Sequence, residues 1–432
     1  MAQTLKFGKG TWATKTGSSM AYNDQNGNYK PLPFNVERDS IATRVNKEGL
    51  IEVVGHDKLR IDYTDSAKGV ALLENSSTNL VTYSEAFSNS YWAKTRASIT
   101  SNSTISPDGT LNASKLIEDT ANGSHFLLVN PVYTTSSVNN VVSLSLFAKK
   151  SERDLQIQSF ASGGGENPKV NFNLTNGTAT SVGLGATPTF SIQSFGNDWF
   201  RCTLTYTVSQ SGSGVRFYIS MVKDNATSYQ GDGTSGVYVW GAMLEENSIA
   251  SSYIPTSGST YQRQADVVNG SGNSEVFNDS EGVLFADISA LVNDNNFKAI
   301  SVSESNADNR ITLSLYQGSL FAYIADGGVG QFNVSQSVGS VLEFHKTAIK
   351  YKANDCAFWI DGFEVAINTS PTTMPSGLKE LAFDQGNGGD DFYGKTKELG
   401  YYDEILTDEE LEYLTSYRSL NELVTELNLN TL

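Results

Sequence analysis

Apolar and polar residues alternate along the middle of the chain, between about residues 81 and 268. The alternation is clearest in six runs: VVSLSLFA (141–148), LQIQSF (155–160), VNFNL (170–174), WFRCTLTYTV (199–208), VRFYISMV (215–222) and VYVWGAML (237–244). A period of two places neighbouring side chains on opposite faces of a β-strand, and turn residues separate the runs. We therefore predict an independent two-sheet sandwich of jelly-roll type over residues 81–268.

Residues 269–418 show similar alternation and two further local signals. Asp361-Gly362 lies between the apolar runs CAFWI and FEVA. This pair is typical of a two-residue hairpin, because a type I′ turn needs positive φ at both central positions. After the last predicted strand, Thr407 and Glu410 form a capping box that predicts the start of a helix. The pattern therefore predicts a second β-sandwich that ends in a short helix.

The two ends of the chain are patterned more weakly. Residues 1–33 carry isolated aromatics among small polar residues, and such a segment cannot build its own core. We interpret residues 1–33 as an extended anchor arm that orders against a partner; a frayed terminus is the alternative. Residues 34–80 predict a short neck of β-strands. Residues 419–432 predict a helical tail, because Ser419 and Glu422 form a second capping box.

The composition limits the classes of partner. The chain has 432 residues and a formal net charge of -17, so we expect more than one core and no nucleic-acid partner. No apolar run approaches the roughly 20 residues that span a bilayer, so we expect a soluble protein without membrane insertion. The first residues lack the apolar centre of a secretory signal, which predicts assembly in a cytoplasm. Cys202 and Cys356 are far apart and are expected to be buried, without a disulfide or metal role.

The segment from residue 34 to residue 92 resembles a module of tailed-bacteriophage fibre, spike and tail proteins. The resemblance depends on the order and spacing of ATRVNKEGLIEV, RIDY, LLEN, TNL, SEAF and the closing Trp92. The first 34 residues are similar to head-fibre and tail-associated proteins of phages that infect gut Bacteroidetes, including crAss-like phages. The resemblance implies a structural virion protein, a homo-oligomer that is most often a trimer, and attachment to a capsid or tail protein through residues 1–33.

Two further segments resemble known modules. The run from Trp240 to Thr256, WGAMLEENSIASSYIPT, is similar to the closing segment of phage fibre modules. Met243 departs from that pattern, where related sequences often have glutamine, so a side-chain hydrogen bond there is in doubt. Arg263 and Asp266 match the motif that usually precedes the next domain. Residues 269–418 resemble a concanavalin-type or laminin-G-like sandwich, a fold that hosts lectins, lyases, hydrolases and inert spacers alike.

No catalytic pattern emerges from the sequence. The histidines His56, His125 and His345 lie in three different regions, and there is no zinc-protease motif, phosphate loop or nucleophile elbow. His345 with Tyr351 is the one pair considered as base and acid of a polysaccharide lyase. We predict that the chain is not an enzyme, with no catalytic residue, cofactor or metal.

Two groups of residues are candidates for ligand binding. The loop 384–391 holds Asp384, Asn387, Asp390 and Asp391, which could bind Ca²⁺ or form an ordinary acidic turn. Four aromatics near predicted loops could stack on sugar rings: Tyr91, Trp92, Tyr229 and Tyr393. Three tryptophans within apolar strands are predicted to be core: Trp199, Trp240 and Trp359.

These observations predict an all-β virion fibre or spike protein with tandem sandwiches that bind host-surface glycans. Many copies on one particle would turn weak sites into useful avidity. Two alternatives remain: a bacterial or prophage carbohydrate-binding protein outside any virion, and a polysaccharide depolymerase. The sequence does not distinguish attachment to the head from attachment to the tail.

Overall fold

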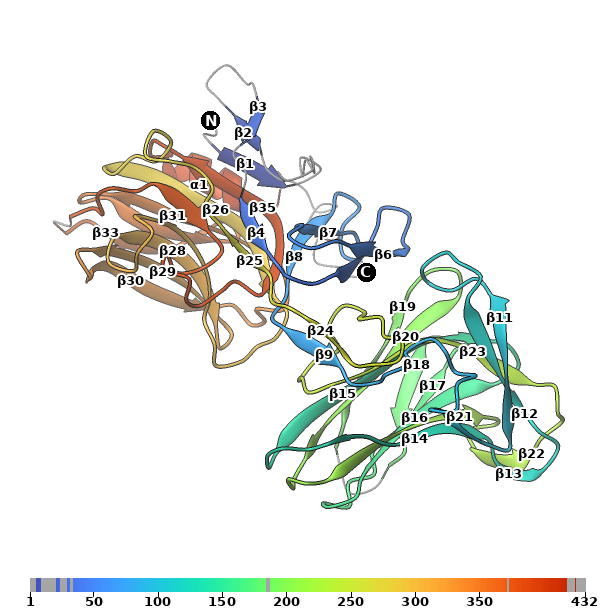
Figure 1. The fold of residues 1–432 in the computed structure, drawn as a ribbon. Coiled ribbons are helices and arrows are strands. Elements are labelled where there is room, and N and C mark those ends of the chain that lie inside the picture. Colours follow the sequence, from blue (N-terminus) through green and yellow to red (C-terminus); the bar gives the residue numbers. More distant parts are fainter. Residues whose placement is uncertain are drawn as a thin grey trace. The chain divides into compact units, whose positions relative to one another are not determined.

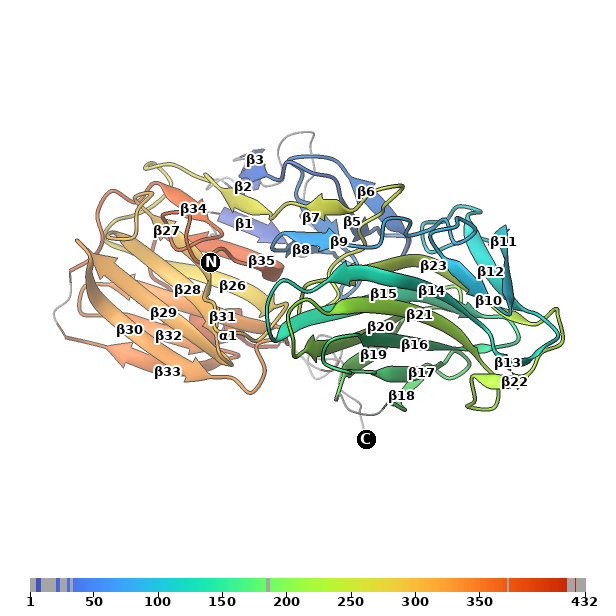
Figure 2. The ribbon, with the colours of Figure 1, turned by 60° about the horizontal axis from the view of Figure 1, so that its bottom comes forward.

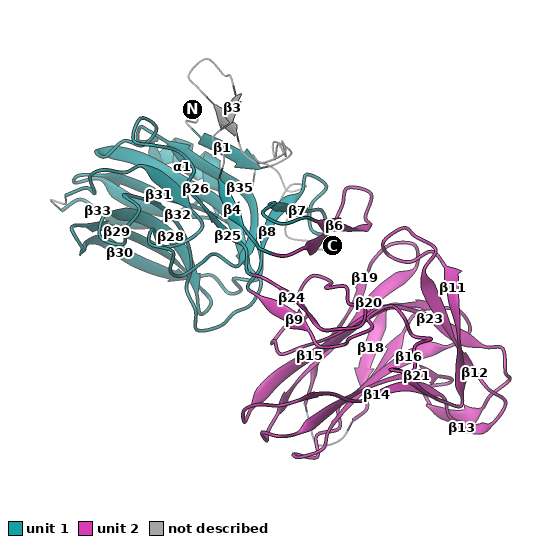
Figure 3. Cartoon of the chain, in the orientation of Figure 1, with its two compact units in different colours: residues 1–39, 55–75, 265–432 teal, residues 40–54, 76–264 magenta. Residues whose placement is uncertain are grey.

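The computed structural model describes residues 5–8, 21–23, 29–31, 34–183, 187–370, 373–417 and residue 424. The chain folds into antiparallel β-sheets with a short helix, which confirms the predicted all-β class (Figure 1). It divides into two compact units (Figure 3). Unit 1 comprises residues 1–39, 55–75 and 265–432, and unit 2 comprises residues 40–54 and 76–264. The two sandwiches are thus interleaved in sequence, whereas we expected consecutive segments.

Unit 2 is built on two six-stranded sheets, whose strands can be followed in Figure 2. The first sheet has the order β10 (Ala93–Thr95), β14 (Phe126–Thr134), β21 (Gly214–Val222), β16 (Asp154–Ala161), β17 (Lys169–Asn173), β18 (Thr178–Ser181). The second has the order β11 (Ala97–Thr104), β12 (Ala113–Glu118), β23 (Gly236–Glu245), β15 (Asn140–Lys150), β20 (Trp199–Val208), β19 (Thr189–Ser194). Alternate residues of both sheets are fully buried in one core, as the period of two predicts.

A second, smaller cluster seals the outer face of the second sheet of unit 2. Its buried members are Ile51, Ala113, Phe147, Trp199, Trp240, Met243, Tyr253 and Ile254. Trp199 and Trp240 are each 1% exposed, which confirms their predicted place in a core. Three strand pairs complete the unit: β5 (Ala42–Val45) with β6 (Ile51–Val54), β9 (Ser77–Asn79) with β24 (Tyr261–Arg263), and β13 (Asn122–Ser124) with β22 (Ser228–Gln230).

Unit 1 is also a sandwich, with one large and one small sheet. The large sheet has the order β3 (Tyr29–Pro31), β2 (Ala21–Asn23), β1 (Leu5–Gly8), β35 (Gly394–Tyr402), β26 (Glu281–Ala290), β31 (His345–Lys352), β32 (Cys356–Ile360), β33 (Phe363–Asn368). Strand β8 (Val70–Leu73) pairs with β35 and with β7 (Arg60–Asp62). The small sheet has the order β30 (Val329–Ser337), β29 (Ser319–Asp326), β28 (Arg310–Tyr316), β27 (Lys298–Ser303), β34 (Glu380–Ala382), and β4 (Asn35–Glu37) pairs with β25 (Val267–Asn269).

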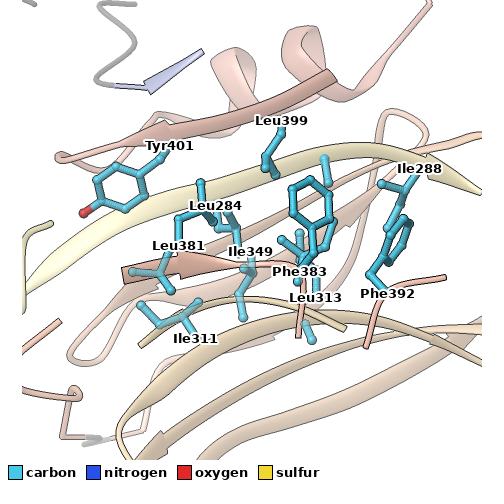
Figure 4. Packing of buried hydrophobic residues seen from close by; sticks show 14 of the residues in the cluster. Leu284, Ile288, Ile311, Leu313, Ile349, Leu381, Phe383, Phe392, Leu399 and Tyr401 are labelled. Atoms are coloured by element: carbon cyan, nitrogen blue, oxygen red, sulfur yellow. The ribbon is translucent and has the colours of Figure 1, made fainter. Parts of the chain in front are cut away.

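The core of unit 1 lies between these two sheets (Figure 4). Leu284 and Ile349 of the large sheet and Ile311 and Leu313 of the small sheet are all fully buried. Cys356 is a buried free thiol in this core, and Cys202 is a buried free thiol in β20 of unit 2, as predicted. Burial of these apolar side chains is the main source of stability for both sandwiches.

Helix α1 (Asp408–Thr415) seals the outer face of the large sheet in unit 1. It begins with the predicted capping box: Glu410 N donates to Thr407 Oγ1 (3.3 Å), and Thr407 N donates to Glu410 Oε2 (3.0 Å). Leu411 of the helix packs in a cluster with Trp359, which confirms that this tryptophan is buried. No helix within the described ranges is long and apolar enough to cross a lipid bilayer.

The predicted hairpin at Asp361-Gly362 is present between β32 and β33. Both residues have positive φ, 49° and 87°, as the type I′ turn requires. The large sheet also takes up part of the expected arm, because β1 pairs with β35 and β2 with β1. Leu5 and Phe7 are buried at 0% and 1%, so apolar burial within unit 1 orders this strand. The predicted helical tail, residues 419–432, lies outside the described residues apart from residue 424.

Candidate functional site

Four charged residues form a buried ion network in unit 1: Arg38, Arg60, Glu74 and Asp266. Arg38 Nη1 donates to Asp266 Oδ1 (2.7 Å), and Arg60 Nη1 donates to Glu74 Oε2 (2.6 Å). Arg60 Nη2 also donates to Asp266 Oδ2, which accepts from Glu74 N at 2.9 Å. Burial alone would lower the pKa of Arg60, but the charges of Asp266 and Glu74 outweigh it and raise the pKa. Each charge is thus paired within the network.

This network lies where the chain changes units. The chain passes between the units at residues 39/40, 54/55, 75/76 and 264/265. Arg38, Glu74 and Asp266 lie beside three of these passages, and Arg38 Nη2 donates to the carbonyl oxygen of Gly55 (2.6 Å) beside the fourth. A buried network in which each charge has a counter-charge fixes segments that are distant in sequence. We therefore assign these four residues a structural role.

The corresponding network of unit 2 is built from amides and hydroxyls. Asn79 Nδ2 donates to the carbonyl oxygens of Ala242 (3.2 Å) and Ile254 (2.8 Å), and its Oδ1 accepts from two backbone N–H groups. Ser84 Oγ lies 2.8 Å from Tyr253 Oη, and Thr256 N donates to Ser84 Oγ (2.9 Å). These bonds join residues 78–80 (TNL) and residues 84–87 (SEAF) to the closing segment, residues 240–256.

Met243 keeps a side-chain contact at the position where we doubted one. Ile254 N lies 3.3 Å from Met243 Sδ, so the sulfur accepts a weak hydrogen bond. Trp240, beside it, packs against Tyr253 with ring centroids 4.6 Å apart. The motif residues Arg263 and Asp266 lie on either side of the passage from unit 2 to unit 1. The closing segment therefore contributes packing and backbone hydrogen bonds.

Two of the four aromatics nominated for sugar stacking, Tyr91 and Trp92, pack against other residues of unit 2. Trp92 is fully buried, and its Nε1 donates to the carbonyl oxygen of Tyr83 (2.9 Å), so it offers no ring face to a ligand. Tyr91 is half-buried, and its ring lies edge-on to that of Trp92. Apolar burial therefore decided the position of Trp92, which the sequence had placed near a loop.

Tyr229 is enclosed by charged neighbours. Arg153 and Lys223 lie 5.5 and 5.8 Å from its ring centre, and its hydroxyl donates to Glu118 Oε2 (2.8 Å). Arg153 in turn binds both carboxylate oxygens of Glu118, at 2.8 and 2.6 Å. Because cations of the protein itself occupy the surroundings of the ring, we assign this cluster to the structure of unit 2.

The acidic loop 384–391 does not gather a metal site. Burial raises the pKa of Asp384 and that of Asp391, and Tyr393 Oη donates to Asp391 Oδ2 (2.9 Å). In the described part of the chain, no three His, Cys, Asp or Glu side chains lie together in a way that could hold a metal ion. The fourth nominated aromatic, Tyr393, is thus bound to the acidic loop.

The histidine and tyrosine considered for lyase chemistry lie apart. Both are on strand β31, and six residues at about 3.3 Å each separate them by roughly 20 Å. His345 Nδ1 lies 2.6 Å from Asp361 Oδ2, whereas Tyr351 Oη donates to the carbonyl oxygen of Asn278 (2.5 Å) inside the core. They cannot serve one sugar residue as base and acid. The sequence placed them on adjacent segments, but they share one strand.

The structure instead brings together a group of residues that we did not nominate from the sequence. They lie on the outer face of the first sheet of unit 2, the face turned away from the core, and we call this group the amide-aromatic face. Its members come from four neighbouring strands: Phe126 and Leu128 of β14, Arg216 and Tyr218 of β21, Gln156, Gln158 and Phe160 of β16, Lys169 and Asn171 of β17.

Rings, amides and cations alternate across the amide-aromatic face. Tyr218 lies opposite Leu128 on one side and Gln158 on the other, and Gln158 lies opposite Lys169. The ring centres of Phe126 and Tyr218 are 5.6 Å apart. The Arg216 guanidinium lies 5.0 Å from the ring centre of Phe160. The rings of Phe126, Phe160 and Tyr218 are half-buried, so part of each remains open to solvent.

Hydrogen bonds orient the amides on this face. Gln156 Nε2 donates to Asn171 Oδ1 (2.6 Å), and Gln158 Nε2 donates to Asn167 Oδ1 (2.7 Å). The Nε atom of Arg216 is buried and has no hydrogen-bond partner among the described residues. The alternation in residues 155–160 and 215–222 already indicated that one side of each strand is polar and aromatic and faces outward. The sequence did not show which of these strands are neighbours in the sheet.

No protein-family model matches this chain, and no curated protein matches it. Among solved structures, the CBM40 module of the Ruminococcus gnavus IT-sialidase, bound to α2,3-sialyllactose, is similar over 33% of this chain and 86% of that chain. The identity is 16% and the TM-score 0.29.

Two other solved structures cover more of the chain. Mouse laminin α1 chain domains LG4-5 are similar over 65% of this chain and 87% of that chain, with 10% identity and a TM-score of 0.23. Trypanosoma rangeli sialidase is similar over 96% of this chain and 99% of that chain, with 8% identity and a TM-score of 0.28.

Proposed function

We propose that this chain is a non-enzymatic adhesion protein that binds host-surface glycans through the amide-aromatic face of unit 2. The observation that carries the proposal is the placement of Tyr218 between Leu128 and Gln158, with Phe126 and Phe160 on the same face. Small-ligand sites combine aromatic surface with a few oriented polar groups, and this face has both. A sugar ring can lie on an aromatic side chain while its hydroxyls bond to amides.

The cations of this face favour an acidic glycan. Lys169 and Arg216 form no ion pair within the described residues, and the guanidinium of Arg216 is held over Phe160. In a chain of net charge -17, two cations beside open rings provide local attraction for a carboxylate or sulfate group. A flat face of this kind binds weakly, so useful adhesion requires several copies.

We propose further that the chain works as a fibre or spike protein in a phage virion, in an oligomer attached to the capsid or tail. The resemblance of residues 34–92 and 240–256 to phage fibre modules supports this proposal, and the paired networks around Asp266 and Asn79 are consistent with a structural module. Leu5 and Phe7 are buried in unit 1, so attachment must use other parts of residues 1–33.

Glycan binding is tested with Tyr218→Ala and Arg216→Gln in the full chain. We expect both variants to lose at least tenfold in affinity for acidic bacterial polysaccharides, measured by glycan array and by isothermal titration calorimetry. Tyr238→Ala is the matched control, because Tyr238 is a half-buried tyrosine on the outer side of the opposite sheet, on β23. Unchanged binding by Tyr218→Ala, or an equal loss with Tyr238→Ala, would exclude this face.

The virion proposal has a separate test. Mass spectrometry of purified phage particles should detect the chain in several copies per particle, and cross-linking should join residues 1–33 to a capsid or tail protein. Particles without the chain would exclude the virion role and leave the binding result untouched.

A further inference from the structure

Unit 1 also has an outer sheet face that its own chain does not seal with a helix. This face belongs to the small sheet and contains three hydroxyl residues, one arginine and four aromatics. We call the group the hydroxyl-aromatic face: Phe297, Ser301, Arg310, Thr312, Ser314, Tyr316, Phe321 and Tyr323. The residues that alternate with them along the strands, such as Ile311, Leu313 and Ile324, point into the core of unit 1.

The four aromatic rings form a continuous ridge. Phe297 and Tyr316 are stacked, with ring centres 4.1 Å apart and an interplanar angle of 10°. Phe321 meets both rings edge-on, at 5.3 and 6.0 Å. Tyr323 follows two residues further along β29, and the Arg310 guanidinium lies 5.1 Å from its ring centre. All four rings are half-buried, so each keeps some surface open to solvent.

Polar atoms without partners lie beside this ridge. Ser301 lies opposite Thr312, and Thr312 lies opposite Tyr323 on the next strand. The hydroxyls of Ser301 and Thr312 and the Nε atom of Arg310 are buried and have no hydrogen-bond partner in the described part of the chain. Ser301 is 0% exposed and Thr312 is 5% exposed. Buried polar groups normally have partners, so three neighbouring exceptions on one face require an explanation.

Carboxylates are rare on this sheet. Strands β27, β28 and β30 contain no Asp or Glu, in β29 only the last residue, Asp326, is acidic, and β34 at the edge of the sheet adds Glu380 opposite Ser303. The whole chain carries 47 acidic residues, so a sheet of this composition differs from the rest of the protein. Exposed Asn333 and Ser335 of β30 continue the face with uncharged polar groups. The face is therefore suited to a ligand without charge.

We propose that the hydroxyl-aromatic face is a second binding face, specific for neutral polysaccharides, so that one chain binds two chemically different glycans. A neutral sugar offers a C–H surface to the ridge of rings and hydroxyls to Thr312 and Arg310, whereas Ser301 lies fully covered beneath the face. A protein partner with a large apolar surface would leave Thr312 and Arg310 unpaired. This inference goes beyond the binding proposed for unit 2, because it concerns other residues, another unit and another class of ligand.

The test uses affinity electrophoresis of the full chain in gels that contain a soluble β-glucan, a mannan, a galactan or starch. We expect the natural chain to be retarded by at least one of these, and Phe321→Ala and Tyr323→Ala to lose most of that retardation. Phe363→Ala is the matched control, because Phe363 is 73% exposed on β33 of the other sheet. Retardation should persist at high salt, since no ion pair is involved.

A variant of unit 2 separates the two proposals. Tyr218→Ala should keep its retardation in neutral gels while it loses binding to acidic polysaccharides. Retardation of the natural chain by none of the four neutral gels would overturn the inference, as would equal retardation of Phe321→Ala, Tyr323→Ala and the natural chain. Circular dichroism of each variant confirms that the fold is kept, because the substituted side chains are half-exposed.

Discussion

Unit 1 and unit 2 fasten distant parts of the chain with different chemistry. In unit 1, four charged side chains form a buried network in which Asp266 joins Arg38 and Arg60. In unit 2, Asn79 and Ser84 do this through amide, hydroxyl and backbone groups, although Tyr253, which contacts Ser84, also donates to the Glu85 carboxylate and the Arg153–Glu118 pair is buried elsewhere in the unit. Buried charges tolerate the loss of one partner poorly, because the remaining charge is left without solvent or a counter-ion. When a neutral network loses one partner, only uncharged polar groups are left unpaired. Loss of one partner should therefore destabilise unit 1 more than unit 2.

The largest effect is expected from Asp266→Ala. This change removes the carboxylate that pairs with both Arg38 and Arg60, which stay buried, and leaves Glu74 paired with Arg60. We expect the free energy of unfolding of unit 1 to fall by about 3–5 kcal/mol. Urea denaturation and differential scanning calorimetry would measure it. Glu281→Ala is the control within unit 1, because its ion pair with Lys352 is partly exposed and should contribute less than about 1 kcal/mol. Equal effects of the two substitutions would contradict the role given to the network.

A smaller effect is expected from Asn79→Ala in unit 2. The change leaves the carbonyl oxygens of Ala242 and Ile254 without their side-chain donor in a buried place. We expect a loss of about 2–3 kcal/mol in the free energy of unfolding of unit 2. Asn122→Ala, on the exposed strand β13, should change the same quantity by less than about 0.5 kcal/mol. If Asn79→Ala destabilised more than Asp266→Ala, the comparison between charged and neutral networks would fail.

The smallest effect is expected from a change of pH, which should alter the stability of unit 1 through His345. Burial by itself lowers the pKa of His345, but the hydrogen bond and charge of Asp361 outweigh it and raise the pKa above its ordinary value of 6.5. The folded state therefore binds the proton more tightly than the unfolded state. The stabilisation is fully present below pH 6.5 and is lost as the pH rises through the folded pKa. Loss of this charge-assisted hydrogen bond should lower the free energy of unfolding of unit 1 by about 1.5 kcal/mol.

Calorimetry of unit 1 between pH 6 and pH 8 measures this loss. His345→Gln should show a smaller decrease in unfolding temperature across the same range, because glutamine has no proton to release. An identical decrease in both proteins would show that another group is responsible.

The local signals in the sequence were sufficient for several features. The Asp361-Gly362 turn and the Thr407–Glu410 capping box each involve neighbouring residues, and their geometry follows from backbone sterics and nearby hydrogen bonds. The buried positions of Trp199, Trp240 and Trp359 follow from the apolar strands around them. Trp92 was a candidate for stacking on sugar rings because it lies near a predicted loop, but its contacts with Phe87 and Phe217 place it in the core.

The sequence by itself determined the strands, their two-sided pattern and the acidic charge, because all of these depend on composition or on residues close together along the chain. Only the tertiary structure decided which strands are neighbours. Arg38 meets Asp266 across 228 positions, and Gln158 comes to lie between Tyr218 and Lys169 through pairing of three separate strands. Such pairing depends on how whole sheets bury their apolar sides, and many strand orders satisfy the same alternation.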